Sequence, residues 1–82
     1  MPSGTKVPIQ VVRKLAGWVA FVRESGLERI RMIPGYHDEP LQGARRGQRS
    51  IRLNEAYRAI YRIRRDGAVE FVSVEEVNKH EY

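Results

Sequence analysis

The sequence predicts a single α+β domain in which an N-terminal helical hairpin packs on one face of a small, twisted antiparallel β-sheet. Apolar residues recur at helical spacing over residues 8–34, and they recur with a period of two from residue 48 onward. An Asp-Gly step at residues 66–67 is typical of a tight turn between antiparallel strands. The length of 82 residues suits one domain with a small core.

The first helix is predicted to start at Pro8, after a disordered lead-in over residues 1–6. Proline suits the first turn of a helix, where its missing N–H would have had no partner. The predicted apolar stripe consists of Val12, Leu15, Val19 and Val22, with Val11 and Trp18 on its flank. Gly26 is the expected C-terminal cap. Gly17 weakens this helix by about 1 kcal/mol relative to Ala and suggests close packing at that point.

A second, short helix is predicted after Gly26, with Leu27, Ile30 and Ile33 on one side. Pro34 and Gly35 end it, because proline lacks the donor a helix needs. Together the two helices make the hairpin of residues 8–34.

Three strands are predicted within residues 48–78. QRSIRLN places Ile51 and Leu53 on one face, with Ser50 and Arg52 on the other. YRAIYRI alternates in the same way: the first face receives Tyr57, Ala59, Tyr61 and Ile63, and the second receives Arg58, Ile60 and Arg62. The third segment, AVEFVSVEEV, is apolar on both faces and is therefore predicted to be central in the sheet.

Composition excludes several classes of chemistry. There is no cysteine, and the two histidines, His37 and His80, do not have the spacing of a zinc site, so neither a metal nor a cofactor is expected. No apolar run is long enough to cross a bilayer. The opening residues MPSGTK lack the apolar core of a secretion signal. A soluble, cytoplasmic protein is expected.

The charge distribution favours a polyanionic partner. Lys and Arg number 15 against 10 Asp and Glu, for a net charge of +5. Every basic residue between Pro40 and Arg65 is an arginine, and Glu55 is the one acid there. Arginine binds phosphate bidentately and stacks on bases, so nucleic acid is a candidate partner. The alternative is a merely solvated strand face. If the apolar faces of the strands contact the helices, then Arg52, Arg58 and Arg62 share the open face.

Candidate residues exist for cleaving RNA through its own 2′-OH. This reaction needs a base for the 2′-OH, an acid for the leaving oxygen and cations for the transition state. Glu39 in the loop HDEPLQG is a candidate base, Arg58 and Arg52 are candidate phosphate ligands, and His80 and Tyr82 could reach the same face. The plainer alternatives are a loop acid at Glu39 and a solvated chain end at His80. His37 and Asp38 fit simple loop polarity, and Tyr57 and Tyr61 fit the core better than a stacking platform.

The stretch EPLQGARRGQRSIRLNEAYRAIYRI resembles the central signature of the RelE/ParE superfamily of bacterial toxins. In that signature an acidic-Pro-Leu-x-Gly loop leads into one strand, and a YR-x-[IV]-Y strand follows. DGAVEFVSVEEV and the terminal KHEY are similar to the closing strand and C-terminal catalytic segment of these toxins. The resemblance is strongest to the HigB and RelE/StbE mRNA-interferase branches, with a tail similar to that of YoeB.

This resemblance implies a toxin that cuts mRNA without a metal, commonly in the ribosomal A site, and that a cognate antitoxin neutralises. It implies Glu39 as the base, His80 as its acid or base partner, Arg58 as the transition-state cation and Tyr82 as the residue that orients the nucleotide. Further RNA contacts are expected from Arg45, Arg46, Arg49, Arg52, Arg62 and Lys79. The expected partners are the antitoxin, mRNA and the small ribosomal subunit, with no membrane.

The chain departs from the family pattern at both ends. The family opens with a β-strand, whereas here the helix follows MPSGTK directly, so the sheet is expected to have an unpaired edge. A strand from an antitoxin or a second copy could add there. The tail reads HEY, in which His80 and Tyr82 share a face if the chain is extended. The rival functions are a non-catalytic ParE-like gyrase inhibitor and an inactive module that binds nucleic acid or antitoxin.

Overall fold

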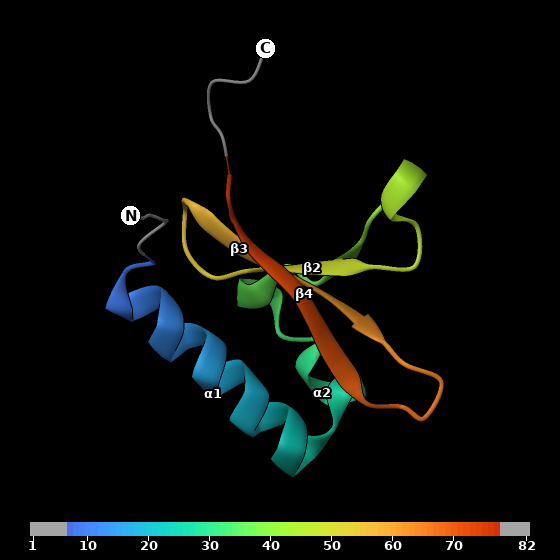
Figure 1. The fold of residues 1–82 in the computed structure, drawn as a ribbon. Helices are drawn as coiled ribbons and strands as arrows, with labels where there is room; N and C mark the ends of the chain where they lie inside the picture. Colours follow the sequence, from blue (N-terminus) through green and yellow to red (C-terminus); the bar gives the residue numbers. More distant parts are fainter. Residues whose placement is uncertain (1–6, 78–82) are drawn as a thin grey trace.

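The computed structural model describes residues 7–77, in which helices pack against an antiparallel sheet (Figure 1). The α+β class predicted from the sequence is confirmed. The helices are α1 (Ile9–Ser25) and α2 (Leu27–Ile30), with 3₁₀ turns η1 (Pro34–Tyr36) and η2 (Gly43–Arg45). The strands are β1 (Glu39–Pro40), β2 (Arg49–Arg52), β3 (Tyr57–Ile63) and β4 (Val69–Glu76). No helix in this part of the chain is long and apolar enough to cross a membrane.

The helical segment is shorter than the sequence predicts. α1 ends at Ser25 and has Gly26 as its C-cap, as expected, but α2 has only four residues. After Ile30 the backbone tightens, since Met32 N–H bonds to Arg29 and Ile33 N–H bonds to Ile30. Ile33 is then extended, as a residue before proline tends to be. Proline therefore ends the helix one turn earlier than its apolar pattern suggested.

The face of α1 that meets the sheet is rotated from the predicted stripe. Val11 and Trp18 are each 1% exposed, whereas Val12 is 47% exposed. Trp18 packs its ring 5.0 Å from that of Tyr61 and 5.6 Å from that of Phe71. Because tryptophan has the largest apolar surface on the helix, its burial sets the rotation. Gly17 does not mark a close approach, since a Cβ there would meet no atom within 4 Å.

The sheet has four antiparallel strands in the order β1-β2-β3-β4 rather than the three predicted. The additional strand is β1, in which Glu39 pairs with Ser50 and Pro40 with Arg49. The prediction that the third segment is central is wrong: β3 lies between two strands, and β4 is at the edge of the described sheet. The apolar side chains on both sides of β4 therefore remain partly exposed at this edge.

The predicted alternation of faces in β2 and β3 is confirmed up to Tyr61, whereas Ile63, predicted for the helix-side face, is 42% exposed and lies outside the core. The core on the helix side contains Ile51, Leu53, Ala59 and Tyr61. On the opposite face, Arg52 pairs across the strands with Arg58, and Ser50 with Ile60. Ile60 is 0% exposed although it lies outside the helix-side core. The open face therefore buries an apolar residue among its polar ones.

Side chains of the turns fix the strand register. Asn54 Oδ1 accepts bonds of 2.8 Å from the backbone N–H groups of Ala56 and Tyr57, which closes the β2–β3 turn. In the predicted β3–β4 hairpin, Asp66 Oδ1 accepts from Ala68 N–H at 3.0 Å. Gly67 has φ 88°, which glycine adopts without strain. This turn is longer than two residues, because Arg64 and Ala68 form the closing backbone bond.

Candidate functional site

A small cavity of about 150 Å³ lies where the loop before β1 meets β2, β3 and the residue after β4. It is lined by His37, Glu39, Ser50, Arg52, Tyr57, Arg58 and Val77. Three of the residues predicted for the site are thereby brought together: Glu39, Arg52 and Arg58. They come from three different strands, so the cavity exists only in the folded sheet.

The strand register explains why these side chains meet. Glu39 is opposite Ser50, and Arg52 is opposite Arg58. Because side chains two residues apart in a strand share a face, Ser50 brings Glu39 to the same face as Arg52. The short strand β1 is therefore the element that carries the acid to the arginines.

The cavity has more cationic donors than acceptors. Arg52 and Arg58 are direct cross-strand neighbours, an arrangement of like charges that destabilises a sheet. Among residues 7–77, Arg52 forms no ion pair, and Arg58 forms one, at 3.3 Å, with Glu75. Arg58 Nε is buried and has no acceptor within the described part of the chain. Two adjacent guanidinium groups with unused donors suit a phosphate oxygen.

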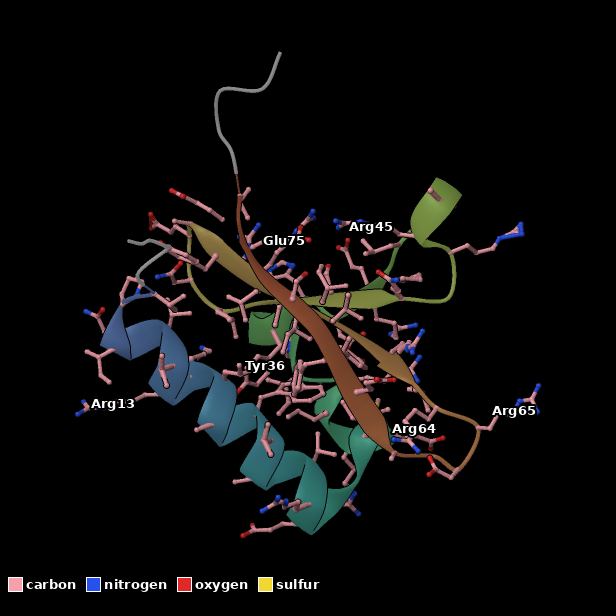
Figure 2. The ribbon with its side chains drawn as sticks, viewed as in Figure 1. Arg13, Tyr36, Arg45, Arg64, Arg65 and Glu75 are labelled. Carbon is pink, nitrogen blue, oxygen red and sulfur yellow. The ribbon has the colours of Figure 1, made fainter. Side chains whose placement is uncertain are left out.

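Glu75 on β4 joins the cavity to the loop that contains η2. Arg45 donates to it in bidentate geometry, at 3.1 Å and 2.7 Å. Figure 2 shows the two side chains extending toward each other from the loop and the strand. Ser73 Oγ donates to the same carboxylate at 2.9 Å. The hydrogen bond from Arg45 lowers the pKa of Glu75 from 4.5 to about 2 and raises that of Arg45.

A second polar cluster lies on the helix side of the sheet. Asp38, whose side chain is 0% exposed, accepts from Arg49 Nε at 2.6 Å and from the Tyr61 hydroxyl at 2.5 Å. Burial, followed by the bond to Asp38, raises the pKa of Tyr61 above its ordinary value. Since Asp38 lies between His37 and Glu39, this cluster anchors the loop that presents both to the cavity.

Arg49 therefore has contacts different from those expected of an RNA ligand. It is paired across the strands with Tyr61, and its side chain is 20% exposed. The sequence alone predicts only loop polarity for its partner Asp38. Asp38, which comes directly before Glu39, is instead the buried acceptor of the loop.

Two cavity residues had been given plainer interpretations. His37 has φ 47°, an uncommon conformation for a residue with a side chain, and it lines the cavity beside Glu39. Tyr57 packs against the core and also lines the cavity. The sequence feature that could have identified His37 as a cavity residue is its position two residues before Glu39. A loop anchored by Asp38 places the residues on both sides of Asp38 at the cavity.

The remaining predicted residues fall in three places. Arg46 and Arg62 are exposed and do not line the cavity, and Arg62 Nε pairs with Glu70 at 2.9 Å. Arg45 does not line the cavity, but it donates to Glu75, which also accepts from the cavity residue Arg58. Lys79, His80 and Tyr82 lie outside the described residues, so their roles stay predictions. Glu75 was not singled out from the sequence, although its register opposite Arg58 determines its contact.

No protein-family model matches the chain, and no match was found among curated proteins or solved structures. The RelE/ParE resemblance therefore stays a prediction. What the site can do follows from its own residues.

Proposed function

We propose that the chain is the toxin of a type II toxin–antitoxin system of the RelE/ParE kind, a metal-independent endoribonuclease that cuts mRNA on the ribosome. The observation that carries this proposal is the cavity itself, which gathers Glu39, Arg52 and Arg58 on one face of the sheet. A carboxylate beside two guanidinium groups is the donor and acceptor set that 2′-OH attack on a phosphate requires.

In this mechanism Glu39 accepts the proton of the ribose 2′-OH, and the 2′-oxygen attacks the adjacent phosphorus. Arg58 and Arg52 hold the non-bridging oxygens and stabilise the additional negative charge of the transition state. The side chain of Arg58 lines the cavity and is 38% exposed, so its guanidinium group is accessible to a phosphate there. The bond to the 5′-oxygen breaks as an acid protonates it, which leaves a cyclic phosphate on one fragment.

Two histidines compete for the role of the acid. The resemblance assigns it to His80, with Tyr82 stacking on the nucleotide. The described residues supply a second imidazole, since His37 lines the same cavity as Glu39 and Arg58. An imidazolium can donate a proton to an oxygen leaving group, so both residues are candidates for the acid. Substituting each in turn separates them.

We further propose that a strand of the cognate antitoxin adds to β4. Within the described sheet β4 pairs with β3 alone, and its apolar residues Phe71, Val72 and Val74 are 37–47% exposed. A cavity of about 450 Å³ lies beside it, lined in part by Trp18 and Phe71. An edge with exposed apolar side chains suits strand addition. A monodisperse isolated monomer whose β4 amides are all protected from hydrogen exchange would contradict this proposal.

The function is tested by inducing the chain in a bacterial host and mapping the ends of abundant mRNAs by primer extension. The wild type should arrest growth and cut translated regions, and Arg58→Ala should lower cutting about 100-fold or more. Arg64→Ala is the matched control, because Arg64 directly follows the same strand, is exposed and lies outside the cavity. Its cutting should stay close to that of the wild type.

Other outcomes separate the rival functions. Growth arrest without discrete cuts would indicate a gyrase-type inhibitor. Equal loss of cutting in Arg58→Ala and Arg64→Ala would indicate general charge attraction rather than a site. If His37→Ala abolishes cutting and His80→Ala does not, the acid is His37, and the opposite result assigns it to His80.

A further inference from the structure

The carboxylate of Glu75 is held by four hydrogen-bond donor groups from three residues on the open face. Oε1 accepts from Arg45 Nη1 at 3.1 Å and from Arg58 Nη2 at 3.3 Å. Oε2 accepts from Arg45 Nη2 at 2.7 Å and from Ser73 Oγ at 2.9 Å. These donors come from η2, β3 and β4, so the sheet and the loop jointly build the arrangement.

This set of donors matches what proteins use to bind a phosphate group. A bidentate arginine, a second arginine and a hydroxyl recognise two oxygens of one anion, whether the anion is a carboxylate or a phosphodiester. The cluster is open to solvent, since the side chains of Arg45, Arg58 and Glu75 are 44%, 38% and 26% exposed. An incoming anion can therefore reach the donors without unfolding the sheet.

Protonation does not release Glu75 under ordinary conditions. Its pKa of about 2 keeps the carboxylate ionised at neutral pH. The arginines are therefore freed only when another anion takes the place of the carboxylate. Arg58 is the link to the cavity, because it lines the cavity and also donates to Glu75.

We propose that Arg45, Ser73 and Arg58 form a second phosphate subsite for the RNA strand, and that Glu75 is the internal anion which occupies this subsite until the strand binds. The inference rests on the proposed nuclease function. A phosphate next to the one being cleaved displaces Glu75, and Arg58, which also lines the cavity, then contacts both phosphates. Binding of the strand and completion of the cationic site are coupled in this way.

The test measures binding of a 2′-O-methyl oligoribonucleotide, which cannot be cleaved, by fluorescence anisotropy at fixed ionic strength. Glu75→Gln should bind about three- to tenfold more tightly than the wild type, the equivalent of removing one ion pair that competes with the ligand. In the Arg45→Ala background the same substitution should bring a much smaller gain, because the bidentate donor of the subsite is absent.

Glu70→Gln is the matched control for net charge. Glu70 is on the same strand and pairs with Arg62 at 2.9 Å, away from the cavity. The Glu70→Gln substitution should change the affinity for the oligonucleotide less than twofold. An equal gain in Glu70→Gln and Glu75→Gln would overturn the subsite, as would unchanged or weaker binding in Glu75→Gln. Thermal unfolding of each variant checks that the fold is retained.

Titration with inorganic phosphate separates failure of the subsite from failure of the proposed function. The arginine Nε–H signals of Arg45 and Arg58 in NMR spectra should respond at lower phosphate concentration in Glu75→Gln than in the wild type. If they do and no RNA is cut, the anion site stands and the nuclease does not. If RNA is cut and neither phosphate nor oligonucleotide distinguishes the two proteins, the nuclease stands and the subsite does not. No response to phosphate and no RNA cutting by either protein would overturn both proposals.

Discussion

Two ionic clusters lie on opposite faces of the same sheet, and they differ in burial and in balance. On the helix side, Asp38 is 0% exposed and is matched by one arginine and one hydroxyl. On the open side, Glu75 is 26% exposed and faces two arginines, one of which keeps an unpaired Nε. The first cluster has its charges matched, and the second has cationic donors left over.

The comparison teaches that burial decides what an ion pair contributes. A charge removed from water destabilises the protein when its partner is lost, so the Asp38 cluster is fixed in place by the fold. An exposed pair contributes little to stability, because water and salt screen it. The Glu75 cluster can therefore exchange its internal anion for a ligand at low cost.

The largest effect is expected for Asp38→Ala. This substitution leaves Arg49 and the Tyr61 hydroxyl without their acceptor and should lower the free energy of unfolding by about 3 kcal/mol. Chemical denaturation of both proteins measures the difference. Glu70→Ala, which breaks the exposed pair with Arg62, should lie within about 0.5 kcal/mol of the wild type. Similar losses in the two variants would remove the distinction between the clusters.

The next effect is expected for Tyr61→Phe, which should cost about 1 to 2 kcal/mol by leaving one oxygen of Asp38 without a donor. Its dependence on pH has a definite sign. The folded protein raises the pKa of Tyr61, so the stabilisation is present below about pH 10, the unfolded pKa, and is lost as the pH rises above it. The gap in stability between wild type and Tyr61→Phe should therefore shrink above about pH 10. A gap that stays constant would contradict the buried bond.

Local patterns were sufficient for much of the fold. The alternation of Ile51 and Ala59 with Arg52 and Arg58 identified both faces of β2 and β3, because the period of a strand is local. The Asp66-Gly67 turn was found for the same reason. The rotation of α1 was not, since Val12 and Val11 are equally apolar and only packing of Trp18 against the sheet distinguishes them.

The parts of the site that were missed depend on register and on distant contacts. β1 has only two residues and exists because Glu39 pairs with Ser50. Arg45 and Glu75 are far apart in the sequence, and no local pattern relates them. Asp38 and Glu39 are adjacent acids in different environments. The side chain of Asp38 is buried on the helix side of the sheet, and Glu39 is exposed and lines the cavity. Only the backbone between them determines which acid faces which way.

The smallest effect is expected for Glu75→Gln, and it sharpens the comparison at low pH. In the folded protein the pKa of Glu75 is lowered from 4.5 to about 2. The ionised carboxylate therefore stabilises the fold above about pH 5, and this stabilisation is lost as the pH falls from about 5 to about 2. At neutral pH, Glu75→Gln should have a lower free energy of unfolding than the wild type. The decrease should be smaller than the decrease caused by Asp38→Ala. The two denaturation midpoints should converge toward pH 2.

Salt adds a second test of the same variant, because screening acts on exposed pairs more strongly than on buried ones. High salt should narrow the gap between wild type and Glu75→Gln and leave the loss in Asp38→Ala almost unchanged. If salt narrows both gaps equally, the two clusters do not differ in their access to solvent, and the exchange of Glu75 for a phosphate loses its physical basis.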